Sequence, residues 1–220
     1  MINNSRDWLL KTIEEKNEWT QVVESIIPIE DNLLKINRKE YKPSFTVLVI
    51  SRKEVKINDI EPSITSRDDI EFVVNIPSDS IWEGGTIDLI KSNNCGWGRV
   101  KDLMSATFNC QNVGDYISKE YQFIEDSLPN HSQVNSYEYL SSRLIRIHRK
   151  EFSPINIMIT NDYEVTNECI TKARNRNDDF SLLVFTNPNT NITQKATKKA
   201  QDLNIEPLTW GDFFSRLNQE

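Results

Sequence analysis

The sequence contains no long hydrophobic run. Its longest apolar run, residues 47–50 with Phe45 just before it, is far too short to cross a membrane. The first seven residues show no basic region followed by an apolar one, so we expect no signal peptide and a cytoplasmic location. A membrane partner is therefore not expected.

Cysteine and histidine are also scarce. Cys95, Cys110 and Cys169 lie far apart without CxxC spacing, which argues against a disulfide framework and a zinc site. The only histidines are His131 and His148, so a histidine-rich metal centre is excluded. We expect neither a resident metal nor a cofactor.

The remaining composition is that of a globular protein. With 220 residues, 37% hydrophobic and 27% charged, the chain is long enough for one large domain or two small ones. The net charge of -7 does not favour general affinity for phosphate backbones, although a local basic patch remains compatible with it.

The first half predicts an α/β region over residues 1–112. Apolar residues at helical spacing predict a helix over 6–27, ended by Pro28. Continuous β-branched runs predict strands over 45–50 and 70–76, and a helix over 81–92 follows with Ser80 as its N-cap. A short helix is expected after a glycine-flanked Trp97, and we expect no internal repeat.

The second half, residues 113–220, predicts the order αβββαβαβα. The expected helices cover 115–128, 165–174, 192–203 and 210–217; the expected strands cover 134–140, 144–150, 155–160, 180–185 and 206–208. Asn204 suits the left-handed residue that ends a helix, and Thr209 suits an N-cap. The predicted class is α/β, with a mixed sheet flanked by helices.

This order resembles the core of the restriction-endonuclease-like superfamily, the PD-(D/E)XK nucleases. The segment LLVFTNPNTNITQKATKKAQDLNIEPLTWGDFFSRL is similar to the closing part of Mrr-type members, in which a strand, a turn, an alanine-bearing helix and a short strand ending Ile-x-x-Leu lead to a final helix. The resemblance implies a nuclease-like fold in a bacterial nucleic-acid or phage-defence system.

The catalytic signature implied by this resemblance is degenerate. Such nucleases hold Mg²⁺ with an Asp and a Glu, and a Lys two residues after the acid activates water. The corresponding strand, PINIMITND, has no acid before Asp162, and the preceding strand carries Arg143 and Arg146 instead of an Asp. We therefore expect a non-catalytic interaction module that binds a protein partner.

A metal-dependent nuclease with an unorthodox acidic site is the first alternative. Asp162 and Glu164 are its candidate catalytic carboxylates, and Glu120 and Glu125 can project from the leading helix. Mg²⁺ would then be its cofactor. Solvated surface carboxylates are the favoured interpretation of all four residues.

Two further features belong to the catalytic alternative. His148 is a candidate general base, and Glu138 is a conceivable cross-strand carboxylate to orient it. Glu54 and Lys56 form a Glu-x-Lys pattern after a strand, but this pattern also arises by chance in a chain this rich in Glu and Lys.

The polar turn after residue 186 gives a second alternative. Asn187, Asn189, Asn191 and Thr193 surround a predicted helix start, where backbone N–H groups can bind a small anion. The structural interpretation is favoured, because Asn191 with Gln194 fits a capping box and the other residues suit turns.

A surface for a partner or nucleic acid is also predicted. Residues 143–150 concentrate cations on one strand, although an ion-paired face is the favoured interpretation. Trp82 is expected in the core. For Trp97 two alternatives stay open, a core position and an exposed loop in which the indole can stack on a ring. The candidate contact residues are Arg143, Arg146, Arg149, Lys150 and Trp97.

Overall fold

The computed structural model describes residues 5–30, 32–39, 42–177 and 179–220. Residues 1–4, which enter the expectation about a signal peptide, lie outside this range. The chain divides into two compact units, Met1–Ser118 and Lys119–Glu220. None of the described helices is long and apolar enough to cross a membrane.

The unit boundary corrects the predicted one, which fell after residue 112. Val113 is fully buried in the core of the N-terminal unit, and Tyr116 packs against the same core. These side chains hold the connecting segment to the first unit, so the boundary follows Ser118.

The N-terminal unit is a five-stranded mixed sheet in the order β1-β2-β3-β5-β7. The first three strands pair antiparallel, and β3, β5 and β7 run parallel. Its strands are β1 (Val23–Glu30), β2 (Leu33–Arg38), β3 (Phe45–Ile50), β5 (Ile70–Asn75) and β7 (Gly96–Arg99). The short strands β4 (Glu54–Val55) and β6 (Ile81–Trp82) form a separate parallel pair.

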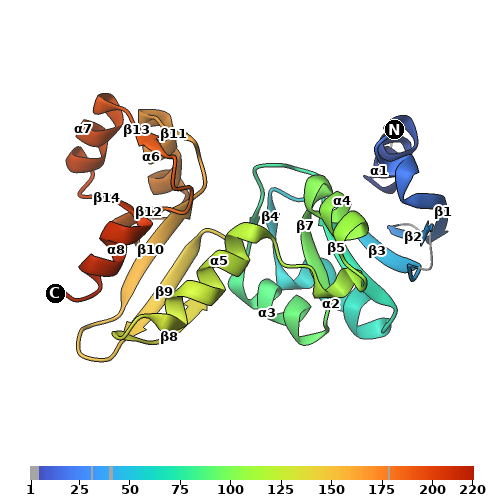
Figure 1. Ribbon diagram of the computed structural model, residues 1–220, viewed down its shortest axis with the longest axis horizontal. Helices are drawn as coiled ribbons and strands as arrows, with labels where there is room; N and C mark the ends of the chain where they lie inside the picture. Colours follow the sequence, from blue (N-terminus) through green and yellow to red (C-terminus); the bar gives the residue numbers. More distant parts are fainter. Residues whose placement is uncertain (1–4, 31, 40–41, 178) are drawn as a thin grey trace. The chain divides into compact units, whose positions relative to one another are not determined.

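Helices cover both faces of this sheet (Figure 1). Their bounds are α1 (Ser5–Glu15), α2 (Ile57–Ser66), α3 (Gly84–Ser92) and α4 (Val100–Asn109), with single turns η1 (Trp19–Gln21) and η2 (Val113–Asp115). Val47 and Val49 point into the core that α1 and α4 close. Leu48, between them, is also buried, so the second face is covered as well.

The C-terminal unit repeats this design with the strand order β8-β9-β10-β12-β14. Its strands are β8 (Val134–Tyr139), β9 (Leu144–Arg149), β10 (Ile155–Thr160), β12 (Leu182–Phe185) and β14 (Glu206–Thr209), with the short pair β11 (Glu164–Val165) and β13 (Asn191–Ile192). Its helices are α5 (Lys119–Ser127), α6 (Asn167–Arg176), α7 (Gln194–Asp202) and α8 (Trp210–Arg216), with the turn η3 (Leu128–Asn130).

The chain is therefore a tandem repeat of one fold, and the expectation of no repeat was wrong. Both units run through the same order of elements, including a parallel pair of two-residue strands beside the main sheet. Few residues are identical between the halves, because burial constrains their polarity and size more than their identity. A repeat of this kind escapes a search for similar sequence.

Single contacts recur in both units 110 residues apart. The Ile76 amide donates to Ile50 O at 3.0 Å, and the Thr186 amide donates to Thr160 O at 2.9 Å. Asn94 and Asn204 both have left-handed φ angles, of 50° and 53°, at the end of a helix. The prediction for Asn204 is thus confirmed, and Asn94 is its counterpart.

The predicted helix over residues 6–27 is wrong beyond Glu15. Residues from Val23 onward form β1, and Pro28 lies within this strand rather than ending a helix. An edge strand tolerates proline because one side needs no ladder hydrogen bond. Pairing with β2, a strand that the sequence pattern does not reveal, overrides the helical spacing.

The predicted starts of α3 and α7 are also wrong. Residues 81–82 and 191–192 form the small strands β6 and β13, so α3 and α7 begin later than expected. The N-cap of α3 is Glu83 instead of Ser80, and the N-cap of α7 is Thr193 instead of Asn191. The pairing of β6 with β4 and of β13 with β11 determines where these helices begin. Local capping patterns carry no information about such pairing.

Candidate functional site

The candidate site lies at one edge of the C-terminal sheet, where β10 and β12 end and the antiparallel β9 begins. The Ile159 amide donates to Arg143 O at 2.8 Å, which fixes Arg143 beside the end of β10. Asn161 follows β10 and Thr186 follows β12. Ligands of α/β proteins bind at this kind of edge, beyond the carboxyl ends of parallel strands.

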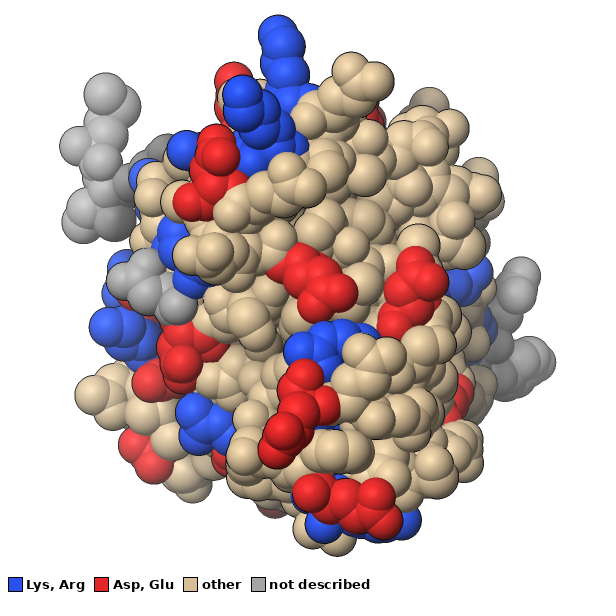
Figure 2. Space-filling model, turned by 90° about the vertical axis from the view of Figure 1, so that its left-hand side faces the viewer, with Lys and Arg blue, Asp and Glu red and all other residues tan. Residues whose placement is uncertain are grey.

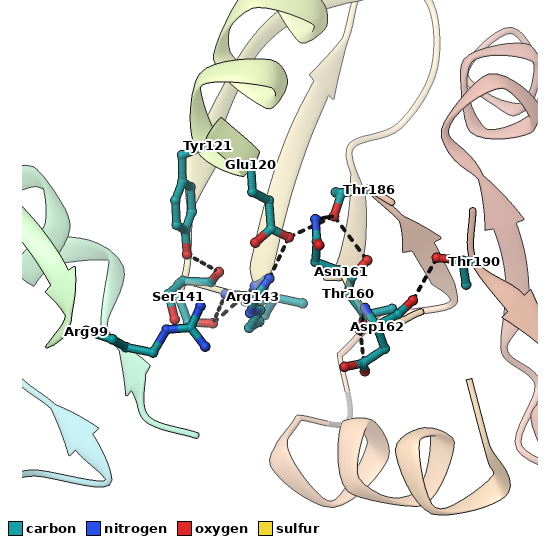
Figure 3. A network of polar contacts seen from close by, with 12 residues as sticks. Arg99, Glu120, Tyr121, Ser141, Arg143, Thr160, Asn161, Asp162, Thr186 and Thr190 are labelled. Atoms are coloured by element: carbon teal, nitrogen blue, oxygen red, sulfur yellow. Dashed lines mark hydrogen bonds and ion pairs between the residues drawn. The ribbon is translucent and has the colours of Figure 1, made fainter. Parts of the chain in front are cut away.

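An ion pair occupies the centre of this edge. Glu120, in the first turn of α5, lies 2.7 Å from the Arg143 guanidinium, with 13% and 27% of the two side chains exposed. Figure 3 shows Glu120 and Arg143 pointing toward each other. Burial alone would lower the pKa of Arg143, but nearby Tyr121, Glu120 and Asp162 raise it, so the guanidinium stays charged.

Hydroxyl and amide groups complete the network around Glu120. The Asn161 side-chain amide donates to Thr186 Oγ1 at 3.0 Å. Thr186 Oγ1 lies 2.8 Å from Glu120 Oε1 and 3.1 Å from Thr160 O, and its proton serves one of these acceptors at a time. The carboxylate of Glu120 is therefore neutralised by an arginine and oriented by a threonine.

The candidate catalytic residues do not assemble around one point. Asp162 is exposed and accepts a hydrogen bond of 2.7 Å from Thr160 Oγ1, and Glu164 is exposed on β11. His148 lies next to Ile147, which pairs with Ile155 at the start of β10, whereas Asp162 follows the end of that strand. The length of β10 separates the base from the acids, so the predicted catalytic set is corrected.

His148 does pair with the carboxylate that the sequence suggested. Its Nε2 lies 3.4 Å from Glu138 Oε1 across β8 and β9. Glu138 also lies 3.7 Å from Arg146, so the imidazole shares this carboxylate with a permanent cation. The pair is an element of a surface ion network rather than a poised general base.

Among the described residues, no group of three or more His, Cys, Asp or Glu side chains is placed to hold a metal ion. Glu54 and Lys56 form an exposed ion pair at 3.9 Å, in which Glu54 belongs to β4 and Lys56 is the N-cap of α2. Glu125 lies on α5 beyond Glu120 and is half-buried.

Turn and cap hydrogen bonds account for the polar turn after β12. Asn187 Oδ1 accepts from the Asn189 amide at 3.0 Å, and the Asn191 amide donates to Tyr163 O at 2.9 Å. Thr193 Oγ1 caps α7 by accepting from the Ala196 amide at 3.2 Å. This geometry agrees with a structural role for the turn, but the cap is Thr193 and the predicted capping box of Asn191 with Gln194 is wrong.

The cations of β9 are engaged within the C-terminal unit. Arg146 Nη2 lies 3.6 Å from Asp179, and Arg149 donates to Ser153 O at 2.9 Å and to Leu217 O at 3.4 Å. Lys150 is exposed at the end of this strand. Lys and Arg side chains are interspersed with Asp and Glu on the face drawn in Figure 2.

Trp82 and Trp97, the two tryptophans whose environment the sequence analysis considers, lie together. Trp82 is 3% exposed, as expected, and its ring centroid is 5.0 Å from that of Trp97. Trp97 belongs to strand β7 and is half-buried, so of its two alternatives the exposed loop is wrong. The neighbouring glycines serve close packing, since a Cβ on Gly96 would meet Phe72 at 2.7 Å.

Sequence reasoning missed the roles of Asn161 and Thr186, and it did not pair Glu120 with Arg143. A usable signal was present for three of these residues, because Arg143 precedes a buried strand and Asn161 and Thr186 each follow one. The pairing itself joins residues 23 positions apart, and only the packing of α5 brings them together.

No family model, no curated protein and no solved structure matches this chain.

Proposed function

We propose that the C-terminal unit is a non-catalytic, nuclease-like interaction module that binds a protein partner. The observation that carries the proposal is the Arg143 guanidinium, held 2.7 Å from Glu120 at the carboxyl edge of the sheet. Arg143 lies directly before the strand in which the nuclease resemblance expects an Asp. A fixed positive charge in a half-buried position repels a divalent cation, so this edge disfavours the Mg²⁺ that such nucleases need.

The state of the basic strand favours protein over nucleic acid as the partner. Arg146 is paired with Glu138 and Asp179, and Arg149 is directed toward backbone carbonyls. Cations that are already neutralised release few counterions when a phosphate backbone approaches, and those ions supply most of the affinity. The net charge of -7 also disfavours binding to nucleic acid.

The turn between β10 and β11 offers an anchor of the kind that protein interfaces use. Tyr163 is 67% exposed, between the exposed carboxylates of Asp162 and Glu164. Hydrogen bonds from Thr190 Oγ1 to Asp162 O, at 2.8 Å, and from the Asn191 amide to Tyr163 O hold this turn in place. A rigid, exposed tyrosine with an acidic border suits a partner that has an apolar pocket and a basic rim.

The resemblance supports a setting in a bacterial nucleic-acid or phage-defence system, where the module would recruit a protein without cutting nucleic acid. Likeness of fold carries this part of the proposal, and fold alone does not determine function.

The test is affinity capture with the tagged full-length protein in the cells that produce it. We expect a captured protein that is lost with Tyr163→Ala and retained with Asn189→Ala, an exposed control in the neighbouring turn. Equal capture by both variants contradicts the proposed anchor. Binding of labelled DNA or RNA at physiological salt, with no protein captured, contradicts the protein partner.

A further inference from the structure

A cavity of about 490 Å³, open to solvent on one side, lies at the surface of the N-terminal unit, apart from the site described above. Its walls are α1, the segment after β5 and the first turns of α4. It therefore sits at the carboxyl end of parallel strands, where α/β folds place their ligands. Its volume falls in the range of about 300–1,000 Å³ that small-molecule sites occupy.

The tandem repeat shows what fills the corresponding space in the other unit. Val100 and Met104 line the cavity, and their counterparts 110 residues later are Trp210 and Phe214. In the C-terminal unit the centroid of the Trp210 ring is 5.1 Å from that of Phe123 and 5.7 Å from that of Phe214. Three aromatic rings, packed with their planes tilted by 50–55°, therefore occupy the place that is hollow in the N-terminal unit.

One of these rings has an equivalent on the cavity wall. Leu9 and Ile13 of α1 are buried with the same four-residue spacing as Ile124 and Leu128 in the second unit. Trp8 precedes Leu9 as Phe123 precedes Ile124, and Trp8 lines the cavity with 45% of its surface exposed. The N-terminal unit thus has Trp8 in the place of Phe123, but it lacks the two rings that Trp210 and Phe214 supply in the C-terminal unit.

Positive charge accompanies the loss of the two rings. Arg99 and Lys101 flank Val100 on the cavity wall, whereas Thr209 and Gly211 flank Trp210. Lys16 adds a third cation to the wall and Glu15 one acid. Arg99 Nε lies 3.5 Å from Asp102, so Lys101 and Lys16 supply most of the positive charge of the lining. Hollow space and positive charge coincide on α4, which indicates a ligand that is both flat and anionic.

We propose that this cavity binds a mononucleotide, with the base stacked on Trp8 and the phosphate near Arg99 and Lys101. The base takes the place of the indole that Trp210 supplies in the C-terminal unit. Aromatic stacking provides affinity with little base preference, and the guanidinium and ammonium groups provide selection for phosphate. This site belongs to the other unit and does not depend on the proposed partner.

The test is calorimetric titration of the full-length protein with AMP, GMP, CMP and UMP, and with adenosine and inorganic phosphate as separate probes. We expect saturable binding of at least one nucleotide, weaker binding of adenosine and no measurable binding of phosphate. Trp8→Ala should weaken nucleotide binding by at least about fivefold, because stacking is lost. Lys101→Gln should weaken it, whereas the exposed control Lys195→Gln should not.

The sharpest variant is Val100→Trp, which rebuilds the ring that the second unit carries. It should abolish binding while leaving the unfolding temperature close to that of the wild type. If Val100→Trp fails to fold, Trp8→Ala is the deciding variant. The Trp8 side chain is partly exposed, so its removal should not prevent folding. No binding of any of the four nucleotides, unchanged binding by a folded Val100→Trp, or phosphate binding as tight as nucleotide binding would each overturn the proposal.

Discussion

At the scale of single residues, the ion pair of Glu120 and Arg143 decides the chemistry of the C-terminal edge. Replacing one partner leaves the other charge half-buried with fewer contacts, which costs more than the pair contributes when intact. We expect Glu120→Gln to lower the free energy of unfolding by about 1–3 kcal/mol.

Urea denaturation of this variant, compared with Glu168→Gln at an exposed position of α6, measures the difference. The control should lie within about 0.5 kcal/mol of the wild type. Two variants of equal stability would show that the edge does not depend on this pair.

A second prediction at this scale concerns Cys95. Burial, assisted by the nearby Glu71 carboxylate, raises the pKa of its thiol to about 12. The neutral thiol therefore persists through the physiological range, and the reactive thiolate forms only under strongly alkaline conditions. Thiol titration of the native protein between pH 7 and pH 9 should leave Cys95 unlabelled, and labelling should follow unfolding. Fast labelling of native Cys95 in that range contradicts this placement.

At the scale of elements, each unit has an arginine at the end of its second strand that donates hydrogen bonds to backbone carbonyls at the end of its last helix. Arg38, 5% exposed, donates to the carbonyls of Cys110 at 2.7 Å and Gln111 at 2.6 Å, and to two others. Arg149 donates to Leu217 O and Gln219 O at the end of α8. The hydrogen bonds of Arg149 are more exposed than those of Arg38, so water replaces them more readily when the arginine is removed.

We therefore expect Arg38→Met to destabilise the N-terminal unit by about 2–4 kcal/mol and Arg149→Met to destabilise the C-terminal unit by about 1–2 kcal/mol. Urea denaturation of each variant, followed by a spectroscopic signal that arises in one unit only, measures the two losses in unfolding free energy. A larger loss for Arg149→Met would contradict the ranking by burial.

The strands show which elements a sequence reveals. β3 and β5 were predictable because their β-branched runs are buried on both faces. β1 was not, because most of its side chains are exposed and its pairing partner β2 lies across a turn. The Glu120–Arg143 contact was hidden for a similar reason, since packing of α5 creates it and Glu120, on a helix, carries no local signal of its partner.

At the scale of the whole molecule, the tandem repeat relates two copies of one fold that have diverged at the same place. The C-terminal copy fills the space beside its fifth strand with Trp210 and Phe214, and the N-terminal copy leaves a cavity there. The repeat is visible in the order of strands and in recurring hydrogen bonds. It is nearly absent from residue identity, which explains why sequence reasoning predicted none.

Each unit has its own buried core, so we expect each to fold alone. Fragments 1–118 and 119–220, produced separately, should each show a cooperative unfolding transition and dispersed amide resonances. A fragment that stays unfolded would show that its core needs the other unit.

We propose that the C-terminal unit does not cleave nucleic acid. The most direct test of this proposal is incubation of the full-length protein with single- and double-stranded DNA and RNA in the presence of Mg²⁺, Mn²⁺ or EDTA, followed by denaturing gels. We predict no metal-dependent cleavage of any substrate by the wild type. Metal-dependent cleavage that is lost with Asp162→Ala would contradict this proposal and identify an acidic active site at the end of β10.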